Sequence, residues 1–175
     1  MKCIFTKMKA CGKRTDLEVV AYTEEEGLEG AKMAVSCGCD ILMGTCYYDS
    51  ILRFCRENNI VYMPFVGEII GRPSVLQGSV ASMEKAAEFL NKKGVSGIDL
   101  LGYRYEGDAQ QLINKMVKKS NLPICVAGSI DGFDRLRFIK EVQPWAFTIG
   151  SAFFEHKFGD SFADQINAVC DFINE

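Results

Sequence analysis

Two short stretches of the chain place glycine and serine at the end of an apolar run. Gly128-Ser129 ends LPICVAGS, Gly150-Ser151 ends WAFTIGS, and the two glycines are 22 residues apart. Glycine lets an anion approach the backbone closely, and free N–H groups at the start of a helix attract negative charge. The four residues therefore predict a phosphate-binding site. Two plain turns are the alternative interpretation.

Charged side chains at other strand ends have the chemistry to complete such a site. Glu68 follows FVG directly and is a candidate general base. Arg104 follows GIDLLGY, and its planar guanidinium suits a second anionic group. Arg72 is a candidate lid residue in the longer segment 67–79. A solvated loop charge is the alternative for each, and the sequence assigns the catalytic roles to Glu68 and Arg104.

The eight cysteines do not form a metal-binding pattern. Cys37 and Cys39 are the only close pair, and the single histidine, His156, is far along the chain. Zinc needs paired ligands at close spacing from two places in the sequence. We therefore expect no metal and no cofactor, with the thiols reduced and structural. Cys46 lies just past an expected strand end and has no assigned role.

Apolar runs alternate with amphipathic segments from residue 17 onward. Strands that are apolar on both faces and separated by helices are typical of parallel sheets. A strand-to-strand spacing of about 20 to 26 residues at most steps favours a βα barrel over a doubly wound sheet. The expected strands are 17–22, 40–45, 60–66, 97–103, 123–128 and 146–150, and the clearest helices are 24–38, 82–94, 108–121, 133–142 and 161–173.

The expected ring is short of strands. KCIFTKM (2–8) adds one short candidate strand to the six, whereas a complete eight-stranded barrel takes at least roughly 200 residues. The expected fold is therefore a single α/β domain over residues 1–175, a parallel βα barrel (TIM-like) that is abbreviated at the N-terminus. A partner subunit in a homo-oligomer is the alternative way to close the ring. The last helix is expected to cover the bottom of the sheet or to close the ring.

Composition and charge exclude several classes of partner. The formal net charge is −3 without long runs of one sign, so nothing indicates nucleic acid or an anionic membrane as partner. No stretch has the pattern of a signal peptide or a transmembrane span. A cytoplasmic location is expected.

The phrases GCDILMGT, IVYMPFV, GIDLLG, LPICVAGSI and AFTIGSAFF resemble the phosphate-binding βα barrels over roughly three quarters of the chain. Within that superfamily the chain is most similar to the 2-keto-3-deoxy-6-phosphogluconate and 4-hydroxy-2-oxoglutarate aldolases. It is also similar to N-acetylmannosamine-6-phosphate epimerases and to the glycerol-uptake antiterminator barrel. The resemblance implies a phosphate held at Ser129 and Ser151.

One departure from the aldolases concerns their chemistry. The resemblance places Gly102 where the aldolases carry the lysine that forms a Schiff base, and the six strands contain no lysine. Lys7, in the candidate N-terminal strand, is the only substitute, because the amine must sit in a dry pocket that lowers its pKa. The catalytic glutamate of that family is not placed by this comparison.

The function expected from these residues is that of an enzyme acting on a small phosphorylated sugar or keto acid. It would act as an isomerase, an epimerase or an aldolase-type lyase. The alternative is a non-catalytic regulatory barrel that binds a phosphorylated metabolite, as the antiterminator resemblance implies. The missing lysine favours this alternative, and the acidic charge balance argues against RNA as its output.

Overall fold

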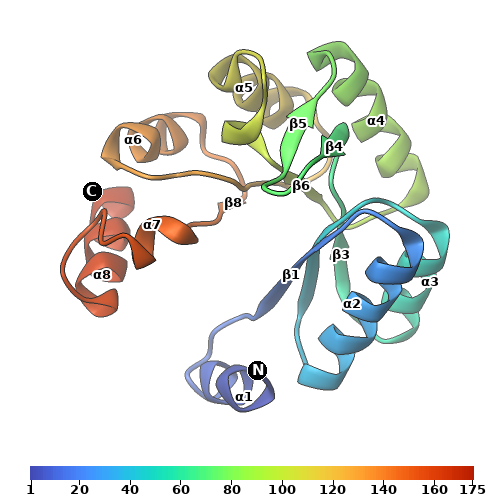
Figure 1. The fold of residues 1–175 in the computed structure, drawn as a ribbon, viewed down its shortest axis with the longest axis horizontal. Coiled ribbons are helices and arrows are strands. Elements are labelled where there is room, and N and C mark those ends of the chain that lie inside the picture. The colour runs from blue at the N-terminus through green and yellow to red at the C-terminus, as the bar shows by residue number, and fades with distance from the viewer.

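The computed structural model describes residues 1–175, and its strands fan round in chain order with helices outside them (Figure 1). The first half contains α1 (Lys2–Ala10), β1 (Asp16–Ala21), α2 (Glu24–Cys37), β2 (Ile41–Thr45), α3 (Asp49–Glu57), β3 (Val61–Met63), β4 (Glu68–Ile70) and β5 (Val75–Gln77). The second half contains α4 (Val80–Lys93), β6 (Ile98–Leu100), the 3-10 helix η1 (Gly102–Arg104), α5 (Ala109–Lys119), β7 (Ile124–Val126), α6 (Phe133–Val142), β8 (Ala146–Phe147), α7 (Ser151–Phe154) and α8 (Phe162–Asn174). All six expected strands are present, and the α/β class is confirmed.

The six strands form two three-stranded parallel sheets that together curve into an open ring and do not close into a barrel. The strand orders are β1-β2-β3 and β6-β7-β8. A parallel bridge between Phe65 and Asp99 joins the two halves, together with a hydrogen bond from the Asp99 N–H to the Pro64 carbonyl at 3.0 Å. β1 and β8 each pair with one strand only, so the ring is open between them.

Burial decreases toward the open side of the ring. Every residue of β2, β6 and β7 is buried, whereas β8 is half-buried and β1 alternates between exposed and half-buried positions before its buried last residue, Ala21. Val19 of β1 packs against Gly30 of α2, so its strand neighbours Glu18 and Val20 face the inside of the ring. The inner face of β1 therefore carries an acid next to the opening.

The core has two parts. The larger cluster lies between the strands and the outer helices and includes Leu42, Ile98, Leu112 and Met83, all fully buried. A smaller cluster lies inside the ring and contains Ile41, Met43, Met63 and Cys125. Helix ends follow the sequence signals: Gly38 and Gly94 end α2 and α4 in the left-handed conformation, at φ 72° and 77°.

Residues 67–79, the extra length after the third strand, form the antiparallel hairpin β4–β5. Leu76 of this hairpin is fully buried, and it bridges Tyr105 in the segment after η1. The Tyr22 hydroxyl donates to the Gly71 carbonyl at 2.8 Å and lies 2.7 Å from the Ser74 hydroxyl. These contacts hold the hairpin against the C-terminal ends of β1 and β6.

Two expectations at the ends of the chain were wrong. KCIFTKM is not a strand but most of α1, because Ile4 and Met8 share one helical face and no strand lies beside it to supply hydrogen bonds. α8 does not close the ring; it packs on α6, and the buried Gln165 donates to the Phe153 carbonyl at 2.9 Å.

The apolar stripe expected on α8 is only partly covered. Val169 is buried, but Phe162 and Ile166 are 46% and 48% exposed, because the helix packs against other helices rather than over the sheet. No helix in the fold combines the length and the apolar character that a membrane span requires.

Candidate functional site

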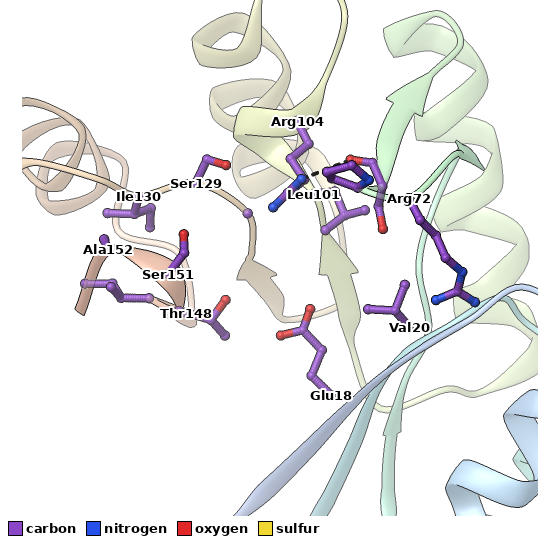
Figure 2. Close-up of a pocket in the computed structure, with 15 residues that line it drawn as sticks. Glu18, Val20, Arg72, Leu101, Arg104, Ser129, Ile130, Thr148, Ser151 and Ala152 are labelled. Carbon is purple, nitrogen blue, oxygen red and sulfur yellow. Dashed lines mark hydrogen bonds between the residues drawn. The ribbon is translucent and has the colours of Figure 1, made fainter. Parts of the chain in front are cut away.

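A cavity of about 380 Å³ opens at the C-terminal ends of the strands (Figure 2). Its walls come from β1, the β4–β5 hairpin and the segments that follow β6, β7 and β8. The C-terminal strand ends are where the active sites of TIM-like folds lie. The volume suits a small ligand.

All four residues of the predicted phosphate site line this cavity: Gly128, Ser129, Gly150 and Ser151. The two serines face the cavity from neighbouring segments (Figure 2). Gly128 and Ser129 are both left-handed, at φ 82° and 48°, so the chain turns sharply after β7. A left-handed serine is uncommon and indicates a backbone held by its surroundings. Arg135 contributes to this, because its guanidinium donates to the Ser129 carbonyl.

Arg104, one of the two predicted catalytic residues, lines the same cavity. Its guanidinium donates to the Ser74 carbonyl of the hairpin at 3.4 Å, the dashed line in Figure 2. The Arg104 stem lies over Gly128, where an added Cβ would come within 2.9 Å of the Arg104 Cγ. Gly128 therefore serves two purposes: it allows the left-handed turn and it leaves room for the arginine.

Glu68, the expected general base, lies elsewhere. It is exposed on β4, pairs with Gln77 across the hairpin and is not among the residues that line the cavity. Gly67 is left-handed at φ 84° and turns the chain away from the strand end. Because residues 67–79 form a hairpin rather than an open loop, closeness to the strand end in sequence does not place Glu68 at the cavity.

Arg72, by contrast, does line the cavity. Its guanidinium lies 4.9 Å from the centre of the Tyr22 ring and 3.8 Å from the Glu26 carboxylate. Cys46 is half-buried outside the cavity, and burial raises the pKa of its thiol. His156 is exposed on the segment after α7 and does not line the cavity.

Glu18 is a cavity residue that the sequence interpretation did not select. Its side chain extends from β1 into the space below Leu101 and Arg104 and beside Thr148 (Figure 2). Solvent reaches Glu18 through the opening of the ring, but enough protein surrounds the carboxyl that burial raises its pKa; the charge of Asp16 raises it further and Arg104 opposes the shift. A glutamate in an otherwise apolar strand, LEVVA, was the available signal.

Asp99 lies deeper inside the ring. It is 0% exposed, and neither carboxyl oxygen has a hydrogen-bond partner. Burial raises its pKa well above the usual range and the charge of Glu18 raises it further, while the nearby backbone N–H of Gly44 acts in the opposite direction. The Cα of Asp99 pairs with that of Cys125 on β7, so the two side chains point to the same face, the inside of the ring.

A second cavity, of about 550 Å³, lies between the unpaired edges of β1 and β8. Glu18, Thr148 and Ile149 line both cavities, so the two adjoin. Arg14 and Trp145 also line the second cavity, and the Arg14 guanidinium lies 5.8 Å from the centre of the Trp145 ring.

The side chains around the two cavities include neither a cluster of metal-ligating groups nor a lysine. No group of three or more His, Cys, Asp or Glu side chains is placed to hold a metal ion. All eight cysteines are free thiols, and burial raises the pKa of Cys39 to about 11 and that of Cys55 to about 12. No lysine lines either cavity, and Lys7 is exposed on α1.

Comparison with known proteins shows which fold the chain has. No protein-family model matches the chain, and no curated protein does. The native KDPGal protein has a TM-score of 0.61 at 12% identity, over 99% of this chain and 72% of that one. Monomers of phosphoribosylanthranilate isomerase from Thermotoga maritima give 0.58 at 15%, over 88% and 70%. The chain has a TIM-like fold.

A third similar structure is a regulator. The glycerol uptake operon antiterminator regulatory protein from Listeria monocytogenes has a TM-score of 0.56 at 14% identity, over 84% of this chain and 72% of that one. The chain spans 46% to 72% of the length of the similar solved structures. At these identities the likeness shows the fold alone.

Proposed function

We propose that this protein is an enzyme that binds a small phosphorylated sugar or keto acid and transfers a proton on it, as an isomerase or epimerase does. The observation that supports the proposal is the meeting of Glu18 and Arg104 with both Gly-Ser ends in one cavity. An anion site and a carboxylate in the same small space are what proton abstraction from a phosphorylated substrate requires.

The phosphate would bind at the Gly-Ser ends. The backbone N–H groups and hydroxyls of Ser129 and Ser151 would donate to its oxygens, and Arg104 would supply the positive charge. Glu18 would then act as the general base on a carbon next to a carbonyl group. Its raised pKa suits the role, because a base is most effective when its pKa approaches the working pH.

The absence of a lysine from both cavities favours proton transfer over an aldolase-type lyase. A Schiff base needs an amine in the site. Isomerases and aldolases are among the proteins that share the fold, but a fold carries many chemistries, so the assignment depends on the cavity itself.

A non-catalytic regulator is the second candidate function. The missing lysine and the structural likeness to the antiterminator regulatory protein favour it. Such a protein would keep the phosphate site without using Glu18 as a base. In either case we propose a homo-oligomer, in which a partner would cover the unpaired edges of β1 and β8.

Proton exchange in D₂O tests the proposal without knowledge of the product. A panel of ketose, aldose and keto-acid phosphates is incubated with the protein, and NMR follows the loss of the C–H signal next to the carbonyl group. We expect Glu18→Gln to slow exchange by about 10²- to 10⁴-fold. Thermal stabilisation by the same phosphates should be unchanged.

Glu68→Gln is the matched control, because Glu68 is an exposed glutamate outside the cavity. Exchange that depends on Glu68 and not on Glu18 would contradict the assignment. Phosphate-dependent stabilisation without exchange of any compound would support the regulator instead.

A further inference from the structure

The inside of the ring has an unbalanced set of acids. Asp16 and Glu18 come from the inner face of β1, and Asp99 comes from β6. The pKa of each of the three is raised, first by burial and, for Glu18 and Asp99, by the charge of the others. No lysine lines either cavity beside them.

The two arginines near these acids have other partners. Arg104 donates to Ser74 at the mouth of the cavity, and Arg14 stacks on Trp145 in the second cavity. Arg104 lowers the pKa of Glu18 but is not among the groups that act on Asp99. None of the three acids forms a salt bridge in the structure.

Asp99 shows most directly that a partner is missing. A fully buried carboxyl group with no hydrogen-bond partner is costly, and native proteins rarely keep one without a reason. Its side chain shares the inner face of the ring with Cys125, which lines the second cavity together with Asp16 and Glu18. The Asp99 carboxyl therefore lies on the inner side of the ring, behind the wall of the second cavity, and lines neither cavity itself.

Glu18 connects this space to the phosphate site. It lines the same cavity of about 380 Å³ as Ser129 and Ser151, and it also lines the second cavity. A small ligand with its phosphate at the two serines would therefore bring its other end to Glu18. A positively charged group that pairs with these acids can therefore be part of the same ligand molecule as the phosphate.

We propose that the substrate is a phosphate monoester carrying a protonated primary amine, with the ammonium bound to Glu18 and with Asp99 behind it. An ammonium group has three N–H donors, which suits carboxyl groups on two sides. A metal ion is a poorer occupant, because no three ligating side chains are placed to hold one.

The inference rests on the proposed function and narrows its substrate class. In a 2-amino sugar phosphate, the carbon that bears the amine is also the carbon next to the carbonyl group. One Glu18 oxygen could then hold the ammonium while the other takes the proton from that carbon, so binding and proton abstraction use the same carboxylate.

Matched ligands test the amine separately from the phosphate. We would measure the affinities of glucosamine 6-phosphate, glucose 6-phosphate and N-acetylglucosamine 6-phosphate by calorimetry. Glucosamine 6-phosphate should bind at least about tenfold more tightly than the other two, because it alone carries a positively charged ammonium group beside the phosphate. Glu18→Gln and Asp99→Asn should each reduce that preference while the binding of glucose 6-phosphate is retained.

The outcomes separate the two proposals. Equal affinity for the three ligands would overturn the amine inference and leave the phosphate function in place. No binding of any of them would also overturn the amine inference, and the exchange panel would then decide the phosphate function separately. An amine preference that survives in both variants would also overturn the inference, because the amine would then be recognised elsewhere. Glu18 is reached by solvent, so Glu18→Gln tests the inference independently of any structural effect of Asp99→Asn.

Discussion

The glycines at the two strand ends allow the structural and ligand-binding roles of the Gly-Ser pairs to be separated. Gly128 is left-handed at φ 82°, and a Cβ there would lie 2.9 Å from the Arg104 Cγ and 3.2 Å from its Cδ. Gly150 has φ −114°, and nothing lies within 4 Å of an added Cβ. We predict that Gly128→Ala lowers stability and displaces Arg104, whereas Gly150→Ala leaves the free protein nearly unchanged.

The size of the effect at Gly128 follows from the backbone. A left-handed conformation costs an alanine about 1–2 kcal/mol, and in a domain of this size each kcal/mol lowers the Tm by about 2–4 °C. Gly128→Ala should therefore melt about 2–8 °C below the wild type. The flexible Arg104 side chain can move aside, so we add no further cost for the close contact.

The assay is thermal denaturation with and without inorganic phosphate. Phosphate at ten times its Kd stabilises a one-site protein by about 1.4 kcal/mol, and both alanine variants should lose most of this shift. Gly132→Ala is the control, because Gly132 is extended, has no atom within 4 Å of an added Cβ and does not line the cavity. An unchanged Tm for Gly128→Ala, or a full phosphate shift in both cavity variants, would refute the reasoning.

Two further predictions concern Asp99 and the hairpin. Folding raises the pKa of Asp99 above its ordinary value of 3.8, so the folded chain holds this proton more tightly and stability falls as the pH rises above that value. Without ligand, Asp99→Asn should therefore be more stable than the wild type, by up to about 1.4 kcal/mol for each pH unit above pH 4. Chemical denaturation at several pH values measures this difference. A difference that does not change with pH would contradict the prediction. Tyr22→Phe removes the hydroxyl that bonds Gly71 at 2.8 Å, and it should cost about 1 kcal/mol and speed proteolysis within residues 67–79. Unchanged cleavage there would show that the hairpin is held by other contacts.

The strands and most helices could be predicted from the sequence because their signals are local. Apolar runs such as ILMGT and the glycines that end α2 and α4 act through the backbone of their own segments. The segment that forms α1 was wrongly expected to be a strand. Its seven apolar and basic residues fit both the helical and the strand periodicity, and only the absence of a neighbouring strand decides in favour of the helix.

Site residues that follow the end of a strand could be predicted from the sequence. Site residues inside a strand could not, because the sequence does not show which face of the strand lines the cavity. Both Gly-Ser pairs and Arg104 follow strands directly, and all reach the cavity. Glu68 also follows a strand, but its position depends on the antiparallel pairing of 68–70 with 75–77, and such a short hairpin has no clear signal in the sequence. Glu18 and Asp99 lie inside strands, where the functional face becomes apparent only once the ring is assembled.

The opening between β1 and β8 also determines which strand pairings the chain must form. Every pair within β1-β2-β3 and within β6-β7-β8 joins strands that follow one another around the ring, separated by one α-helix. The pairing of first with last strand, the most distant contact of a closed ring, is absent, so the loop-closure entropy of that contact is not required. The two halves meet at Phe65 and Asp99. The two halves also share one buried core, so we expect the smaller loop-closure cost to speed folding rather than to divide unfolding into two steps.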